Sequence, residues 1–121
     1  MPEALDEVAL AQLVEMVGDD AEFVDEVVDT YLAESPQQVA AIRAALGAGS
    51  AEDIVRPAHT LKSSSQNLGA TQVAEIARAI EERGRAGGLD GVEGLLADLD
   101  AATVALESEL ERARERRWST A

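Results

Sequence analysis

The spacing of apolar residues is the feature that most restricts how this chain can fold. Apolar residues recur three and four positions apart along most of the sequence, instead of alternating with polar residues as in a half-buried strand. Aromatic residues, which favour strands, make up only 2% of the chain. We therefore predict an all-α protein, an antiparallel up-down four-helix bundle with an additional short N-terminal helix.

Length and charge define the domain and the kinds of partner it can have. The chain has 121 residues, with 24 acidic and 10 basic side chains and a net charge of −14. This length suits one domain, and 46% apolar residues suffice for a core. We expect an N-terminal helix over 1–18, the bundle over 19–112 and a frayed tail over 113–121. The acidic surface disfavours nucleic acid, so the expected partners are proteins.

The first two helices are expected on either side of Gly18. Asp19 or Asp20 can cap the second helix, with Glu22 completing a capping box after Asp19. Pro36 interrupts the second stripe, where we favour a kink over a break capped by Ser35. The apolar stripes are Leu5, Val8, Leu13 and Val17 for the first helix, and Phe23, Val24, Val27, Val28, Tyr31, Leu32, Val39, Ile42 and Leu46 for the second.

Three further helices follow the Gly47–Gly49 break. A capping box of Ser50 and Asp53 opens the third, which Pro57 interrupts early and which ends near Asn67. The glycines between 84 and 91 mark an interhelical turn, because no strand precedes them and no Gly-Lys-Ser/Thr follows. The remaining stripes are Val73, Ile76, Ala77 and Ile80 for the fourth helix, and Val92, Leu95, Leu96, Leu99, Thr103, Leu106 and Leu110 for the fifth, which fades into Arg112–Arg117.

Several classes of site are excluded by composition. The chain has no cysteine and one histidine, which excludes disulfides, a thiolate nucleophile, and cysteine or multi-histidine metal sites. The N-terminus is acidic, unlike a secretory signal, and the apolar runs are far shorter than the roughly 20 residues that span a bilayer. We expect a cytoplasmic protein that contacts neither membrane nor nucleic acid.

One segment carries a candidate for chemistry. On a helix, Ile54, Ala58, Leu61, Ser65 and Leu68 share one face, and His59 points about 140° away from it. The expected neighbours of His59 on the outer face are Arg56, Lys62, Ser63 and Gln66.

A displayed imidazole among hydrogen-bond donors suits phosphoryl transfer. The neutral ring is a nucleophile, and Lys62 and Ser63 could contact phosphoryl oxygens. By themselves, a lone histidine and a nearby lysine on a solvated helix face are more often ordinary surface residues than a functional site. Gly69 costs on the order of 1 kcal/mol if it lies within a helix, which close packing or access for a partner would have to offset.

Residues 58–65 followed by Leu68-Gly69-Ala70 resemble the signature of histidine-containing phosphotransfer (HPt) domains, approximately AHxLKGSSxxxGA. The similarity extends to Tyr31-Leu32 with Pro36, and to Ile80-Glu81 where that family usually has Leu-Glu. The resemblance implies a four-helix bundle whose histidine carries a phosphoryl group between the aspartates of receiver domains.

Carried over by position, His59 is the phosphorylated nucleophile and Lys62 the cation that stabilises the phosphoryl group. Ser63 stands where the family commonly has glycine, and Pro57 is a second departure that leaves the local helix geometry open. Arg56, Gln66 and Gly69 are further binding candidates. The resemblance implies response-regulator receiver partners, including those of a hybrid sensor kinase, and a monomer without kinase or ATPase activity. No cofactor is expected on this chain, since the receiver supplies Mg²⁺.

Other functions stay open at the level of sequence. A non-catalytic adaptor would dock on receiver or kinase domains without being phosphorylated. The tail from Arg112 to Trp118 could instead mediate oligomerisation. A phosphatase would need Glu81 or Glu82 beside His59 as a base for water. Both a free-standing protein and a domain of a hybrid kinase fit the sequence.

Overall fold

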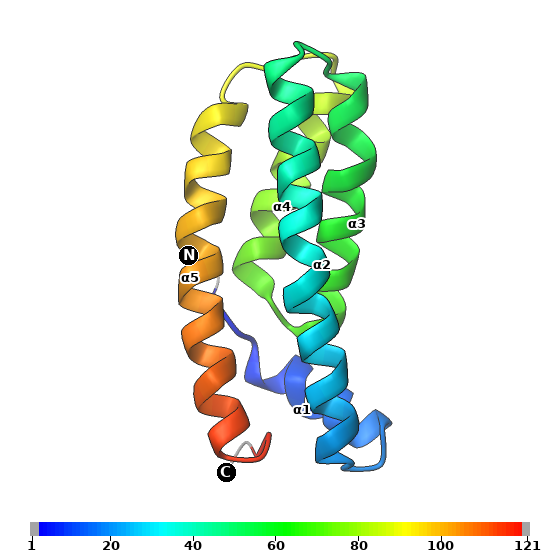
Figure 1. The fold of residues 1–121 in the computed structure, drawn as a ribbon, viewed down its shortest axis with the longest axis vertical. Coiled ribbons are helices and arrows are strands. Elements are labelled where there is room, and N and C mark those ends of the chain that lie inside the picture. The colour runs from blue at the N-terminus through cyan, green and yellow to red at the C-terminus, as the bar shows by residue number, and fades with distance from the viewer. Residues whose placement is uncertain (1–2, 120–121) are drawn as a thin grey trace.

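The computed structural model describes residues 3–119, and within that range all regular structure is helical. Helices α2 to α5 run alternately up and down as an antiparallel bundle, and α1 lies across its lower end (Figure 1). The predicted all-α bundle with a short N-terminal helix is therefore confirmed. The elements are α1 (Glu7–Met16), α2 (Ala21–Gly47), α3 (Glu52–Leu68), α4 (Thr71–Arg85) and α5 (Val92–Glu115).

The core is built mainly from aliphatic side chains of all five helices. Helix α3 packs most extensively on α4 and α2, and α5 packs mainly on α4. The buried side chains include Leu10, Val24, Ile42, Ile54, Leu61, Leu68, Ile80, Leu96, Leu99, Leu106 and Leu110. Within residues 3–119, no helix combines the length and the apolar character needed to cross a membrane.

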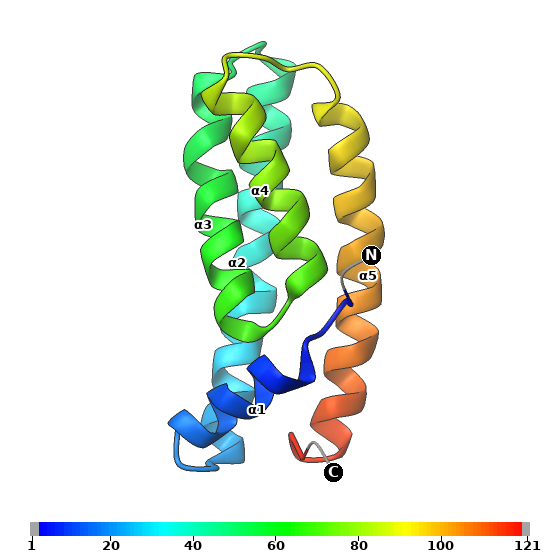
Figure 2. The same cartoon turned by 180° about the vertical axis from the view of Figure 1, so that it is seen from behind.

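The N-terminal segment is fixed to the turn between α3 and α4 (Figure 2). The backbone amide of Asp6 donates to the carbonyl of Gly69 at 2.7 Å, and the amide of Gln72 donates to the carbonyl of Glu3 at 3.2 Å. Gly69 has φ +88°, and a Cβ atom there would lie 2.9 Å from the carbonyl oxygen of Asp6. Glycine thus ends α3 and lets α1 approach, so it serves packing at a helix end.

The start of the chain corrects three sequence expectations. Val8 and Phe23, assigned to the apolar stripes, have 68% and 47% of their surface exposed. Asp20 alone caps α2, accepting a hydrogen bond from the amide of Phe23 at 3.2 Å, whereas Asp19 lies in the turn with φ +60°. The capping box of Asp19 with Glu22 is therefore wrong. Leu5 is buried but precedes α1.

Neither proline ends a helix. Pro36 lies inside α2, so the alternative of a break capped by Ser35 is excluded. Pro57 lies inside α3, and the expectation that it interrupts this helix is wrong. The hydroxyl of Ser50 accepts a hydrogen bond from the amide of Asp53 at 3.2 Å, as a capping residue does, although the helix begins at Glu52.

The described part of the C-terminal tail is packed against the bundle, contrary to the frayed tail expected over 113–121. Helix α5 continues to Glu115, and Trp118 has only 1% of its surface exposed. The indole Nε1 of Trp118 donates to Asp25 Oδ1 at 2.9 Å, and Arg114 lies over the ring. These contacts join the end of the chain to the start of α2. Residues 120–121 of the expected tail lie outside the described residues.

Trp118→Ala tests this packing. Because a large aromatic side chain is buried, its removal should lower the free energy of unfolding by about 3 kcal/mol, measured by urea denaturation. Val104→Ala is the control, since Val104 has 66% of its surface exposed. Equal stability of the two variants would mean that the tail is frayed in solution.

Gly69→Ala tests the approach of α1. An alanine must adopt the left-handed conformation, at about 1–2 kcal/mol, and its Cβ must also displace the Asp6 carbonyl. Gly49→Ala is matched to it, because Gly49 has φ +71° but a Cβ atom there would meet nothing within 4 Å. We expect Gly69→Ala to have the lower midpoint of thermal unfolding. The same midpoint for both would show that the contact with Asp6 is unimportant.

Candidate functional site

Helix α3 displays His59 on its outer face. The five residues predicted to face the core, Ile54, Ala58, Leu61, Ser65 and Leu68, are all buried. The one polar member of this set, Ser65, has its hydroxyl 2.8 Å from the hydroxyl of Tyr31, so burial leaves neither group unsatisfied. The opposite face carries His59, whose side chain is 53% exposed. The prediction that the imidazole is displayed to solvent is confirmed.

Helix α4 brings a carboxylate to this histidine. Glu81 comes from α4 and its Oε2 lies 3.0 Å from Nδ1 of His59. One turn further along α4 is Gly84, where a Cβ atom would lie only 3.0 Å from both the Ala51 carbonyl oxygen and Val55 Cγ2. The missing side chain at Gly84 lets α4 lie close to α3, which places Glu81 within reach of the imidazole.

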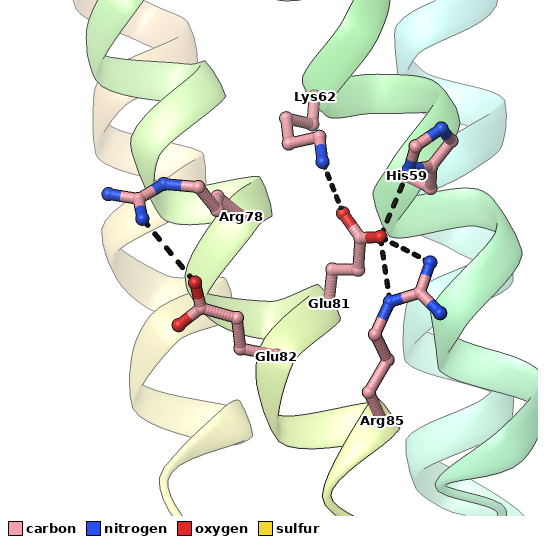
Figure 3. A network of polar contacts seen from close by, with 6 residues as sticks. All are labelled: His59, Lys62, Arg78, Glu81, Glu82 and Arg85. Atoms are coloured by element: carbon pink, nitrogen blue, oxygen red, sulfur yellow. Dashed lines mark hydrogen bonds and ion pairs between the residues drawn. The ribbon is translucent and has the colours of Figure 1, made fainter.

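Three side chains converge on the Glu81 carboxylate (Figure 3). Lys62 Nζ lies 2.8 Å from Oε1 of Glu81 and forms an ion pair with it. Among the described residues, this oxygen has no other polar partner. Arg85 donates to Oε2 from Nε at 3.0 Å and from Nη2 at 2.7 Å. The second oxygen is therefore shared between Arg85 and His59. Glu81 itself is only 5% exposed.

These partners keep Glu81 ionised. Burial of the carboxyl raises its pKa, but the hydrogen bonds from Lys62, Arg85 and His59 outweigh burial and lower the pKa from 4.5 to about 2. A carboxylate accepts hydrogen bonds and has none to donate, so Nδ1 of His59 must carry the ring proton. The neutral imidazole then has its lone pair on Nε2.

The unprotonated nitrogen is available to a second molecule. Nε2 of His59 makes no hydrogen bond or ion pair within residues 3–119, and in Figure 3 the ring extends from α3 with its second nitrogen directed away from Glu81. An open groove of about 760 Å³ adjoins the ring and runs between the N-terminal half of α3 and the end of α4. It is lined by Glu52, Val55, Arg56, His59, Thr60, Gly84, Arg85 and Gly87. A nucleophilic nitrogen therefore lies at the edge of a groove that a partner can enter.

The other residues predicted for the site differ in how close they lie to His59. Lys62 is engaged by Glu81, and Arg56 lines the groove beside His59. Ser63 is half-buried and Gln66 exposed on α3, and neither side chain makes a hydrogen bond within residues 3–119. Gly69 lies at the far end of α3 against α1, so the structure does not bring it to the histidine.

The two acidic residues that could act as a base for water are placed differently. Glu82 points to the other side of α4 and pairs with Arg78, as Figure 3 shows, so it is not beside His59. Glu81 is beside His59, but its low pKa and its cation partners make it a poor proton acceptor. The arrangement favours nucleophilic attack by Nε2 over general-base catalysis by a carboxylate.

Arg85 is a participant that sequence reasoning missed. It stands four residues after Glu81, the spacing that puts oppositely charged side chains of one helix together. That spacing was a usable signal, although only the structure shows that the pair faces His59. Among residues 3–119 no group of three or more His, Cys, Asp or Glu side chains is arranged to hold a metal ion.

Glu81→Gln tests the electrostatic account. Removing the charge leaves Lys62 and Arg85 uncompensated, and should cost roughly 1–2 kcal/mol, less than a fully buried pair because both cations reach solvent. The folded-state pKa is depressed, so ionised Glu81 contributes stability above pH 4.5 and loses it as the pH falls toward about 2. Urea denaturation should thus show the gap between wild type and variant closing over this range. A gap that is constant from pH 6 to 2 would contradict the assignment.

Comparison with known proteins agrees with this geometry. A structure of histidine-containing phosphotransfer protein B (HptB) from Pseudomonas aeruginosa PAO1 superposes with a TM-score of 0.84 at 28% identity, covering 93% of this chain and 96% of that one. No curated protein sequence matches the chain. The model of the Hpt domain family matches residues 26–116, which include α3, α4 and the histidine with its carboxylate. The chain belongs to the Hpt domain family.

Proposed function

We propose that this protein is a phosphorelay carrier, which accepts a phosphoryl group on His59 from a receiver-domain aspartyl phosphate and passes it to a second receiver domain. The observation that carries the proposal is the difference in environment between the two ring nitrogens of His59. Nδ1 is 3.0 Å from the buried Glu81 carboxylate, while Nε2, on a side chain that is 53% exposed, has no hydrogen-bond partner within residues 3–119.

The reaction follows from the different environments of the two ring nitrogens. The lone pair of Nε2 attacks the phosphorus of the aspartyl phosphate, the bond between phosphorus and the aspartyl oxygen breaks, and the aspartate leaves as a carboxylate. The ring then carries both the Nδ1 proton and the phosphoryl group, and its positive charge faces Glu81. Attack by an aspartate of the second receiver reverses these bond changes. No proton has to leave the ring in either direction.

Cations near the ring supply charge neutralisation. Lys62 Nζ uses one of its three N–H groups on Glu81, and the others remain for a phosphoryl oxygen. Arg85 adds a second positive charge on the same side. Phosphoryl transfer depends mainly on positioning and charge stabilisation, so this helix pair needs few further groups. In this proposal Mg²⁺ belongs to the receiver, and the carrier acts as a monomer in the cytoplasm.

Radiolabelled transfer tests the proposal. Receiver domains of the source organism, each phosphorylated with acetyl phosphate and Mg²⁺, are mixed with the protein. We expect at least one to yield acid-labile, alkali-stable label, with the phosphoryl group on Nε2 by ¹⁵N NMR. His59→Gln should lose the label completely, and Gln37→Ala, an exposed change on α2, should keep it.

Two results would overturn the proposal. Label that persists in folded His59→Gln would move the site elsewhere. Binding of a receiver that survives the loss of His59, with no label in the wild type, would favour the adaptor function instead. The melting temperature of each variant establishes that it is folded.

A further inference from the structure

The basic side chains of this chain are almost all engaged within the molecule. Nine of the ten have an acidic or carbonyl partner in the structure: Arg43 with Asp100, Lys62 and Arg85 with Glu81, Arg78 with Glu75, Arg83 with the carbonyl of Asp90, Arg112 with Glu109, Arg114 and Arg117 with Asp25, and Arg116 with Glu7. The side chain of Arg56 alone has no hydrogen bond or ion pair within residues 3–119.

This single unengaged cation lies beside the reactive histidine. Arg56 is one turn before His59 on α3, is exposed, and lines the same groove. Lys62 lies one turn after His59 and is bound by Glu81. The two cations therefore flank the imidazole from opposite directions along the helix, and of these two only Arg56 makes no side-chain hydrogen bond or ion pair within residues 3–119.

A structural role does not account for this arrangement. Arg56 has no acidic partner within residues 3–119, although the chain carries 24 carboxylate side chains. Glu52, four residues earlier and also in the groove, is spaced to pair with it along the helix but makes no ion pair with it. The guanidinium offers a planar set of donors that matches a carboxylate in two hydrogen bonds.

We propose that Arg56 is a docking residue, which binds an acidic side chain of the receiver domain as that domain enters the groove. The inference rests on the proposed function and deepens it, since it assigns part of partner recognition to one residue. Arg56 acts in the encounter and does not touch the transferred phosphoryl group. Glu52, in the same groove, opposes the approach of an acidic group.

The test compares variants with the receiver domain that transfers fastest to the wild type. Initial rates are measured against the concentration of the phosphorylated receiver, at several NaCl concentrations. Arg56→Gln should raise KM about tenfold while kcat changes less than twofold, because it removes an attraction and leaves the chemistry in place. Its KM should also depend less steeply on salt than that of the wild type.

Three variants sharpen the comparison. Arg56→Lys should recover part of the lost affinity, since the charge returns without the planar donors. Glu52→Gln should lower KM about twofold, the opposite direction, through removal of a repulsive charge. Arg112→Gln is the matched control, because it removes an equal charge from α5, outside the groove, and should leave KM unchanged.

The outcomes separate this inference from the function on which it rests. An unchanged KM in Arg56→Gln, an equal rise in Arg112→Gln, or a fall in kcat at constant KM would each overturn the docking role while leaving the carrier function intact. Failure of every receiver to label the wild type would overturn the carrier function, and the docking role with it.

Discussion

The buried carboxylate of Glu81 is the constraint on which the site depends. A charge with 5% exposure is tolerated only when partners offset its lost hydration, and here Lys62, Arg85 and His59 do so. Each of these partners is thereby held in one place. The carboxylate also determines which ring nitrogen of His59 carries the proton. The contacts that stabilise the buried charge therefore also fix the tautomer of the histidine.

Local periodicity made the scaffold predictable. The core face of α3 and the outward direction of His59 follow from helical spacing, because about 100° of rotation per residue fixes which side chains share a face. The order of the helices and the position of Lys62 relative to His59 followed in the same way. Pro57 was expected to interrupt α3 but lies buried within it, because the packing of the surrounding helix outweighs one missing backbone hydrogen bond.

Contacts between distant segments could not be predicted from spacing. Glu81 faces His59 only because α4 lies close to α3. Gly84 permits this close approach, but no local sequence pattern predicts it. Trp118 is similar, since its partner Asp25 lies 93 residues earlier in the chain. Val8 and Phe23 were expected to face the core but are exposed, because an apolar stripe at the start of a helix need not reach the core.

The internal use of nearly all basic side chains has a consequence for the protein among other macromolecules. Cations that already form ion pairs within the fold are not available to bind the many polyanions of a cell. The excess carboxylates also repel those polyanions. Chance association is thereby suppressed over most of the surface. For the proposed relay between two receiver domains, this would confine productive collisions to the small region around His59.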